Sequence, residues 1–97
     1  MTQLTATSHL LVPQHVHVRE FDGELVILDL DKGCYFGLDE VGTRVWQLVS
    51  GGATLAQAVD TLQPEYDAPS ARMLEDFLSL GNEWLERGLV QLREELA

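Results

Sequence analysis

The sequence predicts an α+β domain in which a three-stranded antiparallel sheet is followed by three helices. Three observations support this fold class. The hydrophobic period is two up to Leu38 and 3.6 after it. Two turn signals, Asp22-Gly23 and Asp31-Lys32-Gly33, separate the β-rich segments of the first part. The length of 97 residues, of which 45% are hydrophobic, suits one domain with a single core.

The first part of the chain predicts a loose end and then a meander of three strands. Residues 1–13 lack periodicity, so we expect a flexible N-terminal arm. Val16 and Val18 alternate with polar residues in the first strand. Residues 24–30 are almost continuously apolar, which is typical of a central strand. Residues 34–38 then form a short third strand at an edge of the sheet.

Capping signals define the first two predicted helices. Asp39 caps the first helix, and Gly51-Gly52 ends it. Thr54 begins the second helix, where Gln57 three residues later completes a capping box. This second helix ends at Pro64 because proline cannot continue a helix.

A longer third helix follows the first two. Asp67 or Ser70 caps it, with Pro69 tolerated in its first turn, and Gly88 marks its end. Residues 89–92 are expected to form a short strand or a packed tail.

The predicted order over residues 14–93, before a frayed end at residues 94–97, resembles a winged helix-turn-helix with its sheet placed first. Such domains often bind DNA through the third helix. Here that helix carries four acidic and two basic residues: Glu75, Asp76, Glu83, Glu86, Arg72 and Arg87. Because phosphate would repel this helix, the sequence disfavours a DNA-binding regulator.

The overall charge and the cysteine count exclude further classes. Six Lys and Arg against 16 Asp and Glu give a formal net charge of −10, which opposes binding to nucleic acid and to anionic membranes. A single Cys leaves no pair for an internal disulfide, which favours a reducing compartment. The chain shows no signal-peptide pattern, and no stretch reaches the roughly 20 apolar residues of a membrane span. We therefore expect a cytoplasmic protein.

Candidate catalytic and metal-binding residues are few. Cys34 could act as a nucleophile with His9, His15 or His17 as its base, but its place among aromatic residues in a strand favours a small buried hydrophobe. His15 and His17 share one strand face, yet no third metal ligand is evident beside them. The sequence therefore predicts no enzyme, no cofactor and no metal site.

The third helix has an apolar sector of roughly 160°, which is wider than the ~100° that suffices to cover a core. Its two flanks are Leu74, Leu78 and Leu85 on one side, and Met73, Leu80 and Trp84 on the other, with Phe77 and Gly81 between them. In one interpretation both flanks belong to the core. In the other, one wall of a groove is formed by Met73, Asp76, Phe77, Leu80 and Trp84. Gly81 suits either close packing or room for a ligand backbone.

The predicted edge strand supplies the opposite wall of that groove. Its residues are Cys34, Tyr35, Phe36, Gly37 and Leu38, of which Tyr35 points away from the face that Cys34, Phe36 and Leu38 share. The unpaired N–H and C=O groups of such an edge can accept an extended peptide as a further strand. An edge strand beside an over-wide apolar helix therefore predicts a peptide-binding groove.

The stretches GELVILDLDKGCYFGLDEVGTRVWQLVSGGATLAQAVDTLQPEYD and FLSLGNEWLERGLV resemble the PqqD family of peptide chaperones from pyrroloquinoline quinone biosynthesis. The likeness covers about residues 15–92 and is greatest to the stand-alone B1 proteins of lasso peptide gene clusters. Its most specific parts are LDLDKGCYFGLD, VGTRVWQLVSGG and the closing LERGLV. Asp39 stands where the family often has Asn, and both residues cap helices.

The resemblance implies a non-catalytic recognition element for a ribosomally made, post-translationally modified peptide (RiPP). Such a domain is expected to bind the leader segment of the precursor as a strand beside residues 34–38 and against the third helix, between residues 73 and 84. The resemblance further implies that a separate cysteine protease cuts the leader and that a cyclase closes the lasso ring. An alternative within the family is a chaperone that presents a precursor to a radical SAM enzyme. The net negative charge favours a basic leader.

Overall fold

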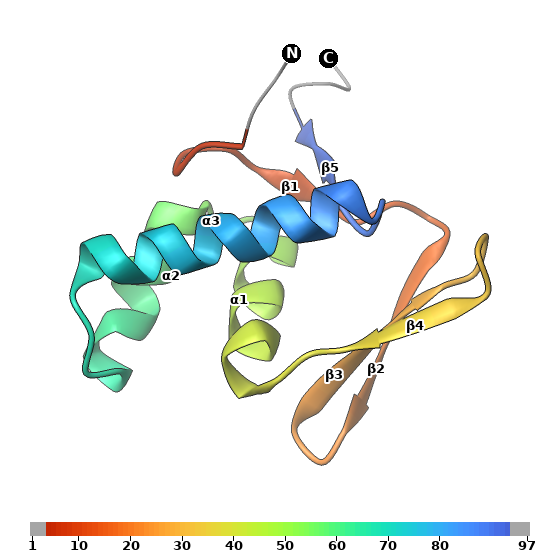
Figure 1. Ribbon diagram of the computed structural model, residues 1–97, viewed down its shortest axis with the longest axis horizontal. Coiled ribbons are helices and arrows are strands. Elements are labelled where there is room, and N and C mark those ends of the chain that lie inside the picture. Colours follow the sequence, from red (N-terminus) through yellow and green to blue (C-terminus); the bar gives the residue numbers. More distant parts are fainter. Residues whose placement is uncertain (1–3, 94–97) are drawn as a thin grey trace.

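The computed structural model describes residues 4–93. Its main elements are the strands β2 (Val16–Phe21), β3 (Glu24–Asp29) and β4 (Cys34–Gly37), followed by the helices α1 (Glu40–Ser50), α2 (Leu55–Leu62) and α3 (Ser70–Glu86). The strands form one antiparallel sheet in the order β2-β3-β4, and the helices lie together to one side of it (Figure 1). The predicted α+β class, with a three-stranded sheet before three helices, is confirmed, and β3 is the central strand as expected.

The two predicted turns take the backbone conformations that their residues favour. Asp22 and Gly23 both have positive φ, at 52° and 83°, as a two-residue hairpin turn between strands of right-handed twist requires. Gly33 has a φ of 69° in the next turn. The resulting register turns alternate residues of β3 inward, so that Leu25 and Ile27 are buried against the helices.

The first residues that the structure describes pack on the domain, which differs from the flexible arm predicted over residues 1–13. Leu4 and Leu10 are only 8% and 5% exposed. The short strand β1 (Leu10–Leu11) pairs antiparallel with β5 (Gln91–Leu92). This segment packs on the domain because burial of its leucines removes apolar surface from water. These leucines do not follow a helical or strand periodicity, so the sequence pattern did not predict their burial. Residues 1–3, and the frayed end predicted at residues 94–97, lie outside the described residues.

Leu4 also explains the glycine in the middle of α3. A Cβ on Gly81 would lie 2.5 Å from Leu4 Cδ2, so the missing side chain makes room for the N-terminal segment. Of the two interpretations of Gly81, close packing therefore holds. The strand predicted within residues 89–92 is present as β5.

The capping signals fix the starts of two helices, but not of the third. Asp39 Oδ1 accepts a hydrogen bond from the Gly42 N–H at 2.7 Å, and Thr54 and Gln57 form the predicted capping box at the start of α2. For α3 the N-cap is Pro69, without any side-chain cap, instead of Asp67 or Ser70. A short 3₁₀ turn, η1 (Gln63–Glu65), follows α2 at Pro64.

One buried hydrogen bond ties α1 to the sheet. The hydroxyl oxygen of Thr43, a residue only 2% exposed, accepts the N–H of Leu25 at 2.9 Å. We expect Thr43→Val, which keeps the shape and removes the acceptor, to lower the free energy of unfolding by about 1–3 kcal/mol because the buried N–H loses its partner. Urea denaturation measures this loss. Thr43→Ser keeps a hydroxyl and should cost less, and an equal loss in both variants would contradict this role of the hydrogen bond.

Candidate functional site

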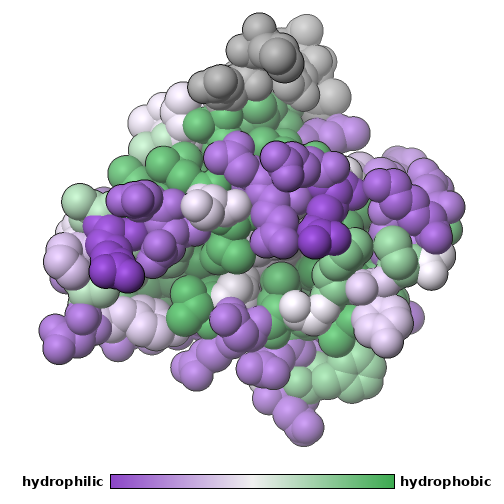
Figure 2. All heavy atoms as spheres, in the orientation of Figure 1, coloured by the Kyte–Doolittle hydropathy of each residue, from purple (hydrophilic) through white to green (hydrophobic). Residues whose placement is uncertain are grey.

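Two hollows adjoin α3: the first lies between α3 and β4, and the second lies between α3, the start of α1 and residues 66–68. The first, of about 490 Å³, is lined by Tyr35, Phe36, Gly37, Leu38, Asp39, Gly42, Leu80, Glu83, Trp84, Arg87 and Leu89. The second, of about 330 Å³, is lined by Asp39, Val41, Tyr66, Ala68, Met73, Asp76, Phe77 and Leu80. Asp39 and Leu80 line both, so the two hollows adjoin each other, and together they are called here the strand–helix groove. Figure 2 shows hydrophobic surface beneath the hydrophilic residues that α3 presents.

The structure brings the residues of both predicted walls to this groove, with one exception. The β4 residues Tyr35, Phe36 and Gly37, together with Leu38, line the first hollow. Every helical residue predicted for the site lines one hollow or both. Cys34 is the exception, since it lines neither hollow and is a half-buried free thiol at the start of β4.

The hydrogen-bond pattern of β4 shows which backbone groups face the open edge. The Leu38 N–H donates to the Leu25 carbonyl at 2.8 Å, so these two residues form a hydrogen-bonded pair. In an antiparallel ladder such pairs alternate. The same pairing toward β3 therefore applies to Phe36, opposite Ile27. The N–H and C=O groups of Tyr35 and Gly37 consequently point away from β3, toward the free edge.

The helical wall of the groove is more buried than the sequence indicated. Met73, Phe77 and Trp84 are 5%, 2% and 2% exposed, so they belong to the core and present only part of their surface as the floor of the hollows. The side chain of Leu80 is half-buried between both hollows, and Asp76 is exposed at the rim. Leu80 is therefore the apolar α3 residue best placed to contact an occupant.

Aromatic packing fixes this floor. The rings of Trp84 and Trp46 meet edge to face, with centroids 5.0 Å apart and planes at 76°. Such pairs contribute about 0.5–1.5 kcal/mol beyond their burial. Because Trp46 lies in α1, the contact sets the position of α3 relative to α1 and so the width of the groove.

Charged side chains border the first hollow. The Arg87 guanidinium lies 4.7 Å from the centroid of the Phe36 ring, and it also pairs with Glu83 at 3.4 Å. Arg87 therefore connects the end of α3 to β4 across the groove. The sequence identified Glu83 and Arg87 among the charged residues of the third helix. It did not identify the other lining residues, which are Asp39, Val41, Gly42, Tyr66, Ala68 and Leu89.

An ion pair lies next to the second hollow. The Arg44 guanidinium donates to both carboxylate oxygens of Glu65, at 2.7 and 2.8 Å, and so fastens η1 to α1 next to Tyr66. The hydrogen bonds from Arg44 hold the pKa of the Glu65 carboxyl below its ordinary value. The contribution of this exposed pair is small, is present at neutral pH, and is lost as the pH falls through the lowered pKa.

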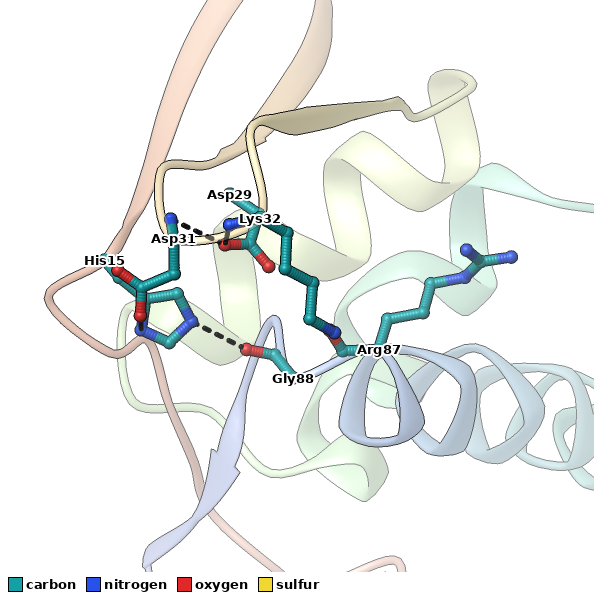
Figure 3. Close-up of polar contacts among 6 residues, drawn as sticks. All are labelled: His15, Asp29, Asp31, Lys32, Arg87 and Gly88. Atoms are coloured by element: carbon teal, nitrogen blue, oxygen red, sulfur yellow. Dashed lines mark hydrogen bonds and ion pairs between the residues drawn. The ribbon is translucent and has the colours of Figure 1, made fainter.

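Polar contacts also join the 29–33 turn to the end of α3 (Figure 3). One oxygen of Asp29 accepts the N–H groups of Asp31 and Lys32, both at 3.1 Å. The His15 ring contacts the Gly88 carbonyl at 3.3 Å, and Lys32 Nζ donates to the Arg87 carbonyl at 3.4 Å. These contacts fix the turn that leads into β4.

Within residues 4–93, no group of three or more His, Cys, Asp or Glu side chains is placed to hold a metal ion. In the same part of the chain, no helix combines the length and hydrophobicity that crossing a membrane would require.

Comparisons with known proteins agree with this geometry. Residues 24–90 match the family model described as coenzyme PQQ synthesis protein D (PqqD). The solved structure "TbiB1 in Complex with the TbiA(beta) Leader Peptide" is 30% identical, with a TM-score of 0.78 over 82% of this chain and 93% of that one. "Lasso peptide synthetase B1 complexed with the leader peptide" shares the fold at 22% identity, with a TM-score of 0.81 over 86% and 98%.

A search of the curated proteins gave no match. The family model spans well over half of the sequence, including the edge strand, all three helices and both hollows between them. This chain therefore belongs to the PqqD family.

Proposed function

We propose that this protein binds the leader segment of a ribosomally made precursor peptide, which adds to the sheet as a strand beside β4. The observation that carries the proposal is the free edge of β4, whose outward backbone groups at Tyr35 and Gly37 adjoin a groove with an apolar floor. The two similar structures support it, because each of them is a complex with a leader peptide.

The groove divides recognition between two kinds of contact. Main-chain hydrogen bonds to β4 would hold an extended peptide of almost any sequence, and the two hollows would select its side chains. Ordering a flexible leader opposes binding, so a few buried anchor residues should dominate the affinity. The mixed charges of Glu83 and Arg87 at the rim favour a leader that is not strongly charged next to the first hollow.

In the finer form of the proposal, the leader belongs to a lasso peptide precursor and the protein is a cytoplasmic, non-catalytic adaptor. It delivers the precursor to a separate cysteine protease that removes the leader and then to a cyclase. Binding raises the local concentration of the cleavage site near the protease, as any tether does. The alternative is a chaperone that presents its precursor to a radical SAM enzyme, as the resemblance to the PqqD family also allows. The enzymes encoded beside the gene distinguish the two.

Titration of the ¹⁵N-labelled protein with the leader from the same gene cluster tests the proposal. We expect the amide signals of Tyr35 and Gly37, and those lining the two hollows, to shift together and to saturate. Signals of the α2 surface serve as the internal reference. A leader that leaves the β4 amides unchanged, or that binds elsewhere, would contradict strand addition.

A proline at Tyr35 tests the backbone contact by itself. Tyr35→Pro removes an outward N–H, so we expect one lost ladder bond of about 0.5–1.5 kcal/mol, or roughly 2- to 12-fold weaker leader binding. Isothermal titration calorimetry measures it. Tyr35→Ala, which keeps the N–H, corrects for the lost ring. Phe36→Pro removes an inward N–H and should instead lower the melting temperature. Equal leader affinities in the Tyr35→Pro and Tyr35→Ala variants would count against the ladder.

A further inference from the structure

A third hollow, called here the turn hollow, lies apart from the strand–helix groove. It measures about 430 Å³ and lies between the 29–33 turn and residues 85–92. Its wall combines charged residues of the turn with apolar residues of the later segment, among them Asp29, Asp31, Lys32, Leu85, Val90 and Leu92. None of its lining residues lines either hollow of the groove, so the proposed leader contacts do not account for it.

The turn hollow contains a buried carboxylate oxygen without a partner. Asp29 is only 1% exposed. Its Oδ1 accepts the N–H groups of Asp31 and Lys32, whereas its Oδ2 has no hydrogen-bond partner within residues 4–93. Figure 3 shows Oδ2 pointing away from these two N–H groups. The turn therefore explains one oxygen of Asp29 and leaves the other to a donor that enters the hollow, because buried polar atoms are normally satisfied.

The charges around the turn hollow favour a donor that is positively charged. Asp29 and Asp31 place two carboxylates in its wall, against the single ammonium group of Lys32. Lys32 does not satisfy Asp29, because its Nζ donates to the Arg87 carbonyl at 3.4 Å and makes no hydrogen bond to Oδ2. A buried carboxylate charge is costly unless a counter-charge accompanies it. The hollow thus lacks one cation.

We infer that the turn hollow binds the positively charged end of a lysine or arginine side chain. Asp29 Oδ2 is the buried acceptor for its N–H group, and Asp31, whose side chain is 75% exposed, is a second acceptor at the rim. An ammonium or guanidinium group supplies both the donor and the charge that the hollow lacks. The apolar residues among 85–92 suit the aliphatic stem of such a side chain.

The cation can come from the bound leader or from another molecule. Arg87 favours the leader as its source. The Arg87 side chain lines the first hollow of the groove, while its carbonyl contacts Lys32 of the turn hollow, so the two sites adjoin at this residue. The leader as source rests on the proposed function, but the cation site itself does not.

Two small amines test the site without any peptide. We expect n-butylammonium and n-butylguanidinium, titrated at constant ionic strength, to give saturable NMR shifts of the Asp31 and Lys32 amides, whose N–H groups donate to the same carboxylate. The amide of Gly88, across the hollow, should shift with them. n-Butylurea has the same stem without the charge and should give no saturable shift. If neither cation binds, the inference is overturned.

Asp29→Asn tests the buried oxygen with little change of shape. The amide oxygen still accepts the two N–H groups of the turn, but an NH₂ group now stands where the cation needs an acceptor. We expect at least about tenfold weaker binding of n-butylammonium. Asp60→Asn is the matched control, because it removes one charge from an exposed residue of α2 that lines none of the three hollows. Equal losses in both variants would show attraction by overall charge alone and overturn the site.

Lys32→Gln tests the site independently of the folding of Asp29→Asn. Lys32 is exposed, and its ammonium group competes with the incoming cation. Its removal should make n-butylammonium binding about 1.5- to 5-fold tighter. Weaker or unchanged binding would contradict the inference. An Asp29→Asn protein with a lowered melting temperature and wild-type amine affinity would show that Asp29 only forms the turn, which would also overturn it.

Titration with the leader from the same gene cluster distinguishes the two sources of the cation. If the leader supplies it, the Asp31 and Lys32 amides shift together with those of Tyr35 and Gly37, and Asp29→Asn weakens leader binding. If only the β4 amides shift, the amine titration supports a site for another molecule. If the β4 amides do not respond, the proposed function fails, while the amine titration still decides the turn hollow.

Discussion

Replacing Leu80 by aspartate should weaken leader binding by at least about 30-fold, equivalent to roughly 2 kcal/mol, while the domain stays folded. The side chain of Leu80 is half-buried and lines both hollows of the groove. In the free protein a carboxylate there can remain hydrated. A bound leader would cover it and remove that water, and burying a carboxylate in this largely apolar groove is costly.

Leu74→Asp is the matched control for this prediction. Leu74 lies on the same helix, is also half-buried, and lines neither hollow. It should show a similar, small change in melting temperature and wild-type leader affinity. Isothermal titration calorimetry and thermal melting of both variants check the two expectations. Gross destabilisation by Leu80→Asp would show that Leu80 is a core residue. Equal losses of leader affinity in Leu80→Asp and Leu74→Asp would contradict a direct contact between Leu80 and the leader.

Trp84→Ala should have the largest effect on stability, a loss of about 3–5 kcal/mol in the free energy of unfolding. The Trp84 side chain is 2% exposed, and its ring packs edge to face on Trp46. Its removal leaves a cavity between α1 and α3. Because small domains have only about 5–15 kcal/mol in total, a large unfolded fraction is expected under mild denaturing conditions.

Urea denaturation of Trp84→Ala beside Trp84→Phe checks this expectation. Phenylalanine retains an aromatic ring against Trp46 and should recover part of the loss. Leader affinity, corrected for the folded fraction, should fall less in Trp84→Ala than in Leu80→Asp, because Trp84 acts mainly through the core. A stable Trp84→Ala protein with abolished leader binding would reverse this assignment and make Trp84 a contact residue.

The sequence predicts the fold well wherever the determinants are local. Asp22-Gly23 specifies its turn through positive φ, and Asp39 and Thr54 specify helix starts through hydrogen bonds that span three residues. The start of α3 is less predictable because no side chain caps it. Pro69 begins this helix through its backbone alone, and the polar residues on either side of it offered more obvious but incorrect candidates.

The N-terminal segment shows what local patterns cannot predict. Leu10 pairs with Leu92 across nearly the whole chain, and the burial of Leu4 depends on the space at Gly81. Neither contact leaves a period or a turn signal in the sequence. Leu4 packs at Gly81 of α3, and Leu10 lies in β1 against β5 and α1, so only the tertiary arrangement creates the surfaces that the two leucines cover.

The candidate site divides in the same way. An edge strand after a tight turn could be predicted from the sequence, but only the register shows that the backbone groups of Tyr35 and Gly37 face outward. The helical wheel of α3 identified a wide apolar sector but could not show how close α1 approaches it. The structure buries half of that sector, namely Met73, Phe77, Gly81 and Trp84, and leaves Leu80 half-buried beside the groove.

The pairing of β1 with β5 has a consequence for how this domain can be combined with others. The antiparallel pair brings residues 10 and 92 side by side, so a connection to another protein can enter and leave at one point. No residue of either strand lines the two hollows of the strand–helix groove. We therefore expect the domain to tolerate insertion into a surface loop of another protein. We also expect it to tolerate circular permutation with a short linker beside the β1–β5 pair. In both cases the strand–helix groove should stay accessible.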